Sequence, residues 1–268
     1  MPARRRLDAE LVRRGLARSR DHAARLVSDG RVRVAGRPAS KAATAVTAAD
    51  PILVVEENLP VEYVSRGGHK LAGALDAFAA DGLTVAGKRC LDAGASTGGF
   101  TDVLLRRGAS RVVAVDVGYG QLAWSLRQDD RVSVHERTNV RDISADLIGG
   151  PVDLVVADLS FISLTLVLGA LVSGATAGAD FVLMVKPQFE VGRERVGKGG
   201  VVRDPAVRAA AVRAVADAAA AHGLGVRGVI ASALPGPAGN VEYFVWLRSG
   251  APPLDPAALD RAVEQGPT

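Results

Sequence analysis

The spacing of hydrophobic residues along the chain changes at about residue 65. Before that point, in residues 6–30, apolar side chains recur every three or four positions, which predicts two short helices. Arg and Val then alternate in RVRVAGR, which predicts a strand with one basic and one apolar face. Farther along, near-continuous apolar runs alternate with helical stretches, a pattern typical of strands that are buried on both faces. The sequence therefore predicts a small α+β segment followed by a doubly wound α/β domain.

Seven apolar runs mark the predicted strands of the larger domain. In chain order they are RCLDAG, RVVAVDVG, RVSVHE, VDLVVADLS, ADFVLMVKP, VRGVIASAL and VEYFVWLR. An alanine-rich stretch at 205–221 is predicted to be a helix that faces the core, and the proline-rich stretch after Gly250 is predicted to be a tail. We therefore expect a small domain, a linker, the α/β domain and a tail, at residues 1–59, 60–65, 66–250 and 251–268.

Polar residues and glycines mark the ends of the two predicted N-terminal helices. Asp8 is expected to cap the first helix, which Gly15 ends. Ser19 is expected to cap the second, which Gly30 ends.

Positive charge is concentrated in the N-terminal segment. The net charge is +4, but residues 1–60 hold 12 Lys and Arg against 7 Asp and Glu, a balance of +5, which leaves −1 for the rest of the chain. Such asymmetry indicates a polyanion partner at one end, and it favours nucleic acid over anionic lipid. A solvated basic face is the alternative.

Several absences in the sequence narrow the class of protein. No window approaches the roughly 18 to 20 consecutive apolar residues of a membrane-spanning helix, so we expect no membrane insertion. The N-terminus lacks the apolar core of a signal peptide. Cys90 is the single cysteine, so no internal disulfide can form, and we expect a cytoplasmic location. No cluster of His, Cys and acidic residues has the spacing of metal ligands, so we predict no metal site.

A glycine-rich loop follows the first strand of the α/β domain. The stretch CLDAGASTGGF, residues 90–100, contains three glycines that permit close backbone approach by a ligand. Its spacing matches neither GxGxxG nor the Walker A motif, so binding of a dinucleotide or a nucleoside triphosphate is disfavoured. Ligands of open α/β sheets bind at the carboxyl ends of the strands, and Asp116 ends the second strand, where an acid can accept hydrogen bonds from ribose hydroxyls.

This loop resembles motif I of the S-adenosylmethionine-dependent methyltransferases. The resemblance implies that the loop packs against the methionine and ribose of S-adenosylmethionine, and that a polar residue after the third strand contacts adenine. Asn139 is our candidate for that contact, with Asp142 as the alternative. The expected cofactor-binding residues are Asp92, Gly94, Ala95, Ser96, Thr97, Gly98, Gly99, Phe100, Asp116, Asn139 and Asp158.

The fourth predicted strand bears on the methyl acceptor. Methyltransferases that act on amines carry an Asn/Asp-Pro-Pro-aromatic sequence there, whereas Asp158 is followed here by Leu-Ser-Phe. Methylation at cytosine C5 requires a cysteine nucleophile near the fourth or fifth strand, and Cys90 lies on the first. A hydroxyl acceptor remains. Its oxygen needs a base, or a cation that stabilises the developing alkoxide, and a lysine at the end of a strand, such as Lys186, suits both roles.

Four residues resemble the Lys-Asp-Lys-Glu tetrad of the FtsJ-type RNA 2′-O-methyltransferases. They are Lys70 in SRGGHKL, Asp158, Lys186 in VKPQFEVG, and Glu242 in NVEYF. The resemblance implies that these four are catalytic. We expect Lys70 to lie on a helix and to point towards Asp158.

The N-terminal segment resembles the S4 RNA-binding domain, on the stretch LDAELVRRGLARSRDHAARLVSDGRVRVAGRPASK. The resemblance implies docking on structured RNA through phosphates and shape. The expected RNA-binding residues are Arg4, Arg6, Arg18, Arg20, Arg25, Arg31, Arg33, Arg37 and Arg66.

Both domains together resemble the TlyA family of rRNA cytidine-2′-O-methyltransferases, some members of which are called hemolysins. Stretches that carry the resemblance include SRGGHKL, LDAGASTGGFT, DLSFISL and LPGPAGNVEYF. It implies methylation of cytidine ribose in ribosomal RNA on assembled subunits, and we expect a monomer. Some members have Arg-Ala-Trp-Val in the linker where this chain has Val61, Glu62, Tyr63 and Val64. A ribosome-binding factor without activity and a membrane-active hemolysin are the alternative functions.

Three residues beside the predicted tetrad have two interpretations. Phe161, Gln188 and Phe189 could contact a nucleotide flipped out of its helix, or they could pack in the core or a loop. His69 is expected to be structural.

Overall fold

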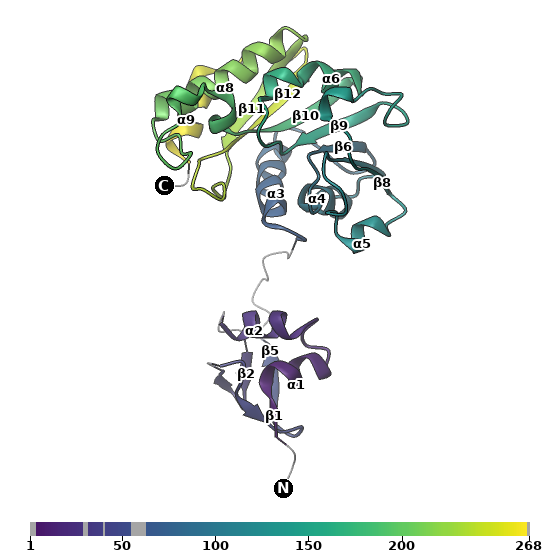
Figure 1. Ribbon diagram of the computed structural model, residues 1–268, viewed down its shortest axis with the longest axis vertical. Coiled ribbons are helices and arrows are strands. Elements are labelled where there is room, and N and C mark those ends of the chain that lie inside the picture. Colours follow the sequence, from purple (N-terminus) through teal and green to yellow (C-terminus); the bar gives the residue numbers. More distant parts are fainter. Residues whose placement is uncertain (1–3, 29–31, 40, 55–62, 267–268) are drawn as a thin grey trace. The chain divides into compact units, whose positions relative to one another are not determined.

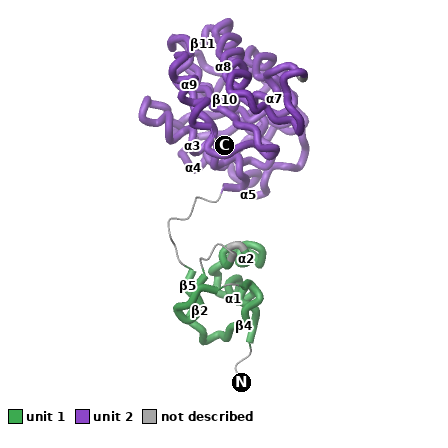
Figure 2. Tube along the Cα trace, turned by 90° about the vertical axis from the view of Figure 1, so that its left-hand side faces the viewer, with its two compact units in different colours: residues 1–61 green, residues 62–268 purple. Residues whose placement is uncertain are grey.

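The computed structural model describes residues 4–28, 32–39, 41–54 and 63–266. The chain divides into two compact units, residues 1–61 and 62–268 (Figure 2). Each unit is described by itself. The predicted linker at 60–65 stays a prediction, because its first three residues lie outside the described part of the chain.

Unit 1 is a small α+β domain around two packed helices. Its elements are β1 (Arg5–Arg6), α1 (Leu7–Arg13), α2 (Arg20–Ser28), β2 (Val32–Val34), β3 (Arg37–Pro38), β4 (Ala45–Val46) and β5 (Ile52–Val54). Strands β3, β2 and β5 form one antiparallel sheet, and β1 pairs with β4. Leu7, Leu11, Leu26 and Val32 are buried in its core, so the predicted helical and alternating patterns are confirmed.

The two predicted helix caps have different outcomes. The Ser19 hydroxyl accepts a hydrogen bond from the backbone N–H of His22 at 3.1 Å, so its role as the cap of α2 is confirmed. Helix α1 begins at Leu7, so the prediction that Asp8 caps it is wrong. The Asp8 carboxylate is buried in the first turn and accepts hydrogen bonds from the guanidinium groups of Arg6 at 2.9 Å and Arg20 at 3.2 Å.

Unit 2 contains a seven-stranded sheet in the order β11-β12-β10-β9-β6-β7-β8 (Figure 1). The strands are β6 (Arg89–Ala93), β7 (Arg111–Val115), β8 (Val132–His135), β9 (Val152–Ala157), β10 (Ala175–Val185), β11 (Leu224–Ala231) and β12 (Tyr243–Ser249). From β10 to β8 all neighbours are parallel, and β12 runs antiparallel between β10 and β11. The predicted doubly wound α/β fold is confirmed.

Helices cover both faces of this sheet. They are α3 (Arg66–Ala79), α4 (Gly99–Arg106), α5 (Trp124–Arg127), α6 (Leu168–Ser173), α7 (Pro187–Glu190), α8 (Pro205–Ala220) and α9 (Pro256–Glu264), with short 3₁₀ turns η1 (Val140–Asp142), η2 (Leu164–Leu166) and η3 (Arg193–Arg195). Strand β12 shows the two faces. Phe244 and Trp246 pack in the core under α3 and α4, whereas Tyr243, Val245 and Leu247 pack in the core under α6, α8 and α9. Sheet and helices therefore form three layers.

The C-terminal segment differs from the predicted tail. Asp255 caps α9 by accepting hydrogen bonds from the backbone N–H groups of Ala257 and Ala258, and Pro256 is the first helical residue. Leu259 is completely buried against the sheet. Residues 256–264 are therefore an integral part of unit 2, because burial of an amphipathic face outweighs the local proline content.

Candidate active site

Strand directions bring distant parts of unit 2 to one edge of the sheet. Asp158 follows β9 and Lys186 follows β10, and both strands end at this edge because they are parallel. Strand β12 is antiparallel to β10, and its first residue, Tyr243, pairs with Val185. Glu242 therefore lies at the same edge as Lys186, although it precedes a strand rather than following one.

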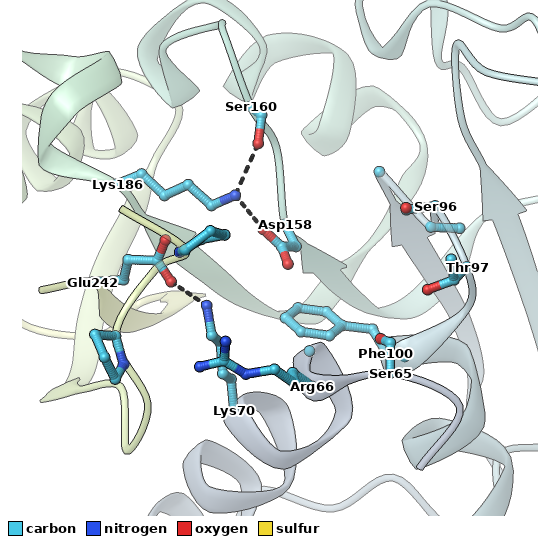
Figure 3. Close-up of a pocket in the computed structure, with 16 residues that line it drawn as sticks. Ser65, Arg66, Lys70, Ser96, Thr97, Phe100, Asp158, Ser160, Lys186 and Glu242 are labelled. Carbon is cyan, nitrogen blue, oxygen red and sulfur yellow. Dashed lines mark hydrogen bonds and ion pairs between the residues drawn. The ribbon is translucent and has the colours of Figure 1, made fainter. Parts of the chain in front are cut away.

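The four predicted tetrad residues form two ion pairs (Figure 3). Lys70 Nζ of α3 lies 2.5 Å from Glu242 Oε2, and Lys186 Nζ lies 2.5 Å from Asp158 Oδ1. Lys186 also donates a hydrogen bond to Ser160 Oγ at 3.0 Å. Lys70 thus pairs with Glu242, and the prediction that it points towards Asp158 is wrong. Burial of a charge is costly unless it is paired, and Lys70, Lys186 and Glu242 all expose less than a tenth of their surface.

A cavity of about 260 Å³ opens onto both ion pairs. All four predicted catalytic residues line it, together with Arg66 of α3. The remaining lining residues are Ser65, Gly67, Gly94, Ala95, Ser96, Thr97, Gly99, Phe100, Ser160, Pro235 and Pro237. Lysines and carboxylates thus face one cavity.

A second cavity, of about 480 Å³, adjoins the first. Gly94, Ser96, Asp158 and Ser160 line both cavities. The other residues that line the second cavity are Val115, Asp116, Val117, Gln121, Thr138, Asn139, Val140, Leu159, Phe161 and Ile162. The loops after β6 and β9 therefore form a wall that the two cavities share.

Backbone conformation and close packing explain two glycines of the loop after β6. Gly94 has φ +87°, and a Cβ there would lie 2.6 Å from the carbonyl oxygen of Asp158. Gly98 has φ +97°, and a Cβ there would meet the side chains of Leu126 and Leu122. A side chain would be strained at both positions, and at Gly94 it would also clash with the backbone.

Acid and amide side chains fix the loops around the larger cavity. Asp116 Oδ2 accepts a hydrogen bond from the backbone N–H of Ser96 at 2.8 Å, and Oδ1 accepts one from Gly118 at 2.7 Å. Asn139 Oδ1 accepts from the backbone N–H of Arg141 at 3.0 Å and so caps η1. Asn139 lines the cavity and Asp142, the alternative, does not.

Two predicted cofactor-binding residues line neither cavity. Asp92 is completely buried and accepts a hydrogen bond from Thr101 Oγ1 at 2.6 Å, which ties β6 to α4. Burial raises the pKa of Asp92 to about 7. Gly98 packs against α5. The other predicted loop residues, Ala95, Thr97, Gly99 and Phe100, line the smaller cavity.

Glu190 of α7 holds the loop that carries Phe161. Its carboxylate accepts hydrogen bonds from Ser163 Oγ at 2.5 Å and from the backbone N–H of Leu164 at 2.9 Å. Phe161 has φ +65°, exposes 92% of its surface and lies against Phe189, with ring centroids 5.2 Å apart. A non-glycine residue with positive φ and an exposed aromatic ring is typical of a functional position.

Sequence reasoning missed Ser65, Ser160, Pro235 and Pro237, which line the smaller cavity. Ser160 lies between Asp158 and Phe161, which the sequence analysis had singled out. An irregular loop has no periodicity, however, from which the direction of the Ser160 side chain could be predicted. Pro235 and Pro237 precede the selected Glu242 in LPGPAGNVEYF. That stretch carries part of the family resemblance, so it was the signal from which the two prolines could have been identified.

The predicted RNA-binding arginines of unit 1 are exposed wherever the structure describes them. These are Arg4, Arg6, Arg18, Arg20, Arg33 and Arg37. Arg31 and the side chain of Arg25 lie outside the described residues. Arg6 and Arg20 both bind the carboxylate of Asp8, and the hydrogen bond from Arg6 lowers the pKa of Asp8 to about 2. Arg66, the remaining predicted member, lies in unit 2 and lines the smaller cavity.

Three further features bear on metal binding, membrane insertion and cysteine chemistry. Within the described residues, no group of three or more His, Cys, Asp or Glu is placed to hold a metal ion. No helix in the same part of the chain is long and apolar enough to cross a membrane. Cys90 is buried, which raises the pKa of its thiol to about 12.

Known proteins resemble both units. The FtsJ-like methyltransferase family matches residues 63–249, and the S4 domain family matches residues 5–52. The 16S/23S rRNA (cytidine-2′-O)-methyltransferase TlyA of Mycobacterium tuberculosis is 60% identical over 273 residues, which cover 100% of each chain. Hemolysin A of Brachyspira hyodysenteriae is 37% identical over 240 residues, 89% of this chain and 98% of that protein.

A solved structure extends the comparison to three dimensions. A protein from Streptococcus thermophilus, described as a candidate hemolysin, is 39% identical with a TM-score of 0.72, and the match covers 99% of this chain and 96% of that one. These similarities confirm the family predicted from the sequence. The chain belongs to the TlyA family, in which an S4 domain precedes an FtsJ-like methyltransferase domain.

Proposed function

We propose that this protein transfers a methyl group from S-adenosylmethionine to the 2′-hydroxyl of a cytidine in ribosomal RNA. The name of the M. tuberculosis relative supports this acceptor. The observation that carries the proposal is the position of the Lys186–Asp158 ion pair, since Asp158 lies on the wall shared by a cofactor-sized cavity and a smaller polar one.

The larger cavity fits a nucleoside cofactor. Its volume of about 480 Å³ is within the range of small-molecule sites. Gly94 lets the loop after β6 lie against the backbone of Asp158, Asp116 would accept hydrogen bonds from ribose hydroxyls, and Asn139 would bind the adenine edge. Bound S-adenosylmethionine would supply an electrophilic methyl group. Ser160 and Asp158 would then lie where the methyl donor meets the acceptor ribose.

The smaller cavity supplies groups that can activate a ribose hydroxyl. As the 2′-oxygen bonds to the methyl carbon and the carbon–sulfur bond breaks, the hydroxyl proton must leave. Lys186 would accept this proton, or its ammonium would stabilise the developing alkoxide, while Asp158 fixes the nitrogen. The Lys70–Glu242 pair lines the same cavity and would hydrogen-bond the acceptor ribose.

Both units would contact RNA. The exposed arginines of unit 1 would bind phosphates, and Arg66 would bind a phosphate near the acceptor. Phe161 would stack on the target base after it leaves its helix, because its ring is almost fully exposed at the rim of the cofactor cavity.

Methylation of purified ribosomal subunits tests the proposal. The protein is incubated with labelled S-adenosylmethionine and 30S or 50S subunits, and methylated riboses are mapped. We expect label at a cytidine 2′-oxygen, and we expect Lys186→Ala to abolish transfer while cofactor and subunit binding stay within about threefold of wild type.

Other outcomes point to the alternative functions. Cofactor binding without label on either subunit would indicate a ribosome-binding factor without activity. Leakage from protein-free lipid vesicles on addition of the pure protein would support a lytic activity.

A further inference from the structure

We propose that Ser160 is a positioning residue that, together with Asp158, directs the side-chain nitrogen of Lys186 at the acceptor hydroxyl. This inference rests on the proposed function, because it assigns Lys186 the 2′-hydroxyl as its third partner. It adds a residue outside the Lys-Asp-Lys-Glu set.

The position of Ser160 follows from the sheet. Strands β9 and β10 are parallel neighbours, and Ala157, the last residue of β9, pairs with Leu183. The loop after β9 therefore lies beside Lys186, which comes directly after β10. Asp158 and Ser160 are separated by one residue on this loop, and both approach the same nitrogen (Figure 3).

The two oxygens hold the Lys186 nitrogen in different ways. Ser160 Oγ accepts a hydrogen bond from this nitrogen at 3.0 Å, which fixes one of its three tetrahedral directions. Asp158 Oδ1 lies 2.5 Å from the nitrogen as an ion-pair partner and accepts no hydrogen bond from it. The Asp158 charge therefore holds the nitrogen in place and the Ser160 hydrogen bond sets its rotation, which leaves the other directions for the acceptor.

The loop that carries Ser160 is itself fixed. Glu190 holds it through Ser163 and Leu164, from the helix that begins at Pro187, directly after Lys186. Base and positioning hydroxyl are therefore connected through α7. Lysine has a long flexible side chain, so a second fixed oxygen reduces the positions that its nitrogen can adopt.

Because Ser160 is exposed, loss of its hydroxyl should affect turnover without affecting the stability of the fold. Ser160 is exposed and lines both cavities, so water can replace its oxygen in the free protein. When RNA and cofactor fill the cavities, water is excluded and no other group replaces it. Loss of the hydroxyl should therefore affect kcat and leave the melting temperature unchanged.

The test compares Ser160→Ala, Ser160→Thr and a matched control, Ser173→Ala. Ser173 also donates a hydrogen bond in unit 2, to the carbonyl oxygen of Ile143, and it lines neither cavity. We expect Ser160→Ala to lower kcat about tenfold with the KM values for cofactor and subunit within about twofold. Ser160→Thr keeps the hydroxyl and should recover most of kcat, and Ser173→Ala should match wild type.

A pH profile gives a readout that a purely structural role would not change. The charged and titratable groups that line the cavity with Lys186 are Asp158, Lys70, Glu242 and Arg66, and none is altered by Ser160→Ala. Loss of an acceptor disfavours the ammonium form, so the rising limb of the kcat profile should move to lower pH.

The two readouts distinguish failure of this inference from failure of the proposed function. If wild type methylates RNA and Ser160→Ala has an unchanged kcat and pH profile, or Ser160→Thr fails to recover activity, the positioning role is wrong. If wild type methylates neither subunit, the proposed function fails, and the assignment of the 2′-hydroxyl as the third partner of Lys186 is overturned with it.

Discussion

Removal of the Glu242 carboxylate would leave a buried lysine without its counter-charge. Lys70 and Glu242 expose 8% and 1% of their side chains, and their charged atoms lie 2.5 Å apart. Glu242→Gln keeps the shape of the side chain, so the Lys70 ammonium must remain buried unpaired or lose its proton. Breaking a buried ion pair from one side costs about 3 to 5 kcal/mol. The free energy of unfolding of a domain is on the order of 10 kcal/mol, so we expect a loss of about a third or more.

Tryptophan fluorescence measures this loss in unit 2 alone, because both tryptophans of the chain, Trp124 and Trp246, lie there. For a domain of this size, the loss corresponds to a melting temperature lower by roughly 6 to 20 °C. Replacing both partners, with Lys70→Met and Glu242→Gln, should restore most of the stability, since no buried charge remains.

A matched control removes a charge from an exposed pair. Asp255→Asn keeps the cap of α9 but removes the ion pair with Arg261, in which both side chains are 61% exposed, and should change stability by less than about 1 kcal/mol. The reasoning is refuted if Glu242→Gln melts within about 2 °C of wild type, or if the double variant is no more stable than Glu242→Gln.

Three further predictions concern the cofactor loop, the buried acid behind it and the basic unit. Gly94→Ala would place a Cβ 2.6 Å from the Asp158 carbonyl oxygen at φ +87°, so cofactor affinity should fall at least about tenfold by equilibrium dialysis; unchanged affinity would exclude the close approach. Burial raises the pKa of Asp92 from 3.8 to about 7, so the unfolded chain releases this proton first and stability is lost as pH rises between these values. Asp92→Asn should therefore melt above wild type at pH 8, with the difference disappearing towards pH 4, and a constant difference would contradict this linkage. Replacing Arg33 and Arg37 by Ala should lower the slope of log affinity against log salt by about 2 for subunit binding, whereas Arg261→Ala should leave the slope unchanged.

The strand-end residues could be predicted from the sequence because the rule that governs them is general. Parallel strands deliver the residues that follow them to one edge, and Asp158 and Lys186, two of the predicted catalytic residues, lie together there. The partner of Lys70 could not be predicted in this way. It depends on the register of the antiparallel β12 and on the position of α3 beneath it, and neither is encoded in a local pattern.

Two other predictions, for Asp92 and for the C-terminal segment, differ from the structure. Asp92 was expected to contact the cofactor because it belongs to the loop motif, but it is the fourth residue of β6 and points into the core, where Thr101 meets it. Residues 256–264 were assigned to a tail because of the nearby prolines. The Asp255-Pro256 pair is a helix-start signal, and the buried Leu259 supplies the apolar face.

The wall between the two cavities has a consequence for inhibitor design. Gly94, Ser96, Asp158 and Ser160 border both volumes, so a compound that fills the nucleoside cavity needs only a short linker to reach the two lysines. Linking two weak fragments converts the second binding step into an intramolecular one, with an effective concentration in the millimolar range for a short flexible linker. A hydrogen-bonding group on such an arm would meet the Lys70–Glu242 and Lys186–Asp158 pairs, and calorimetry against the unlinked fragments would measure the gain.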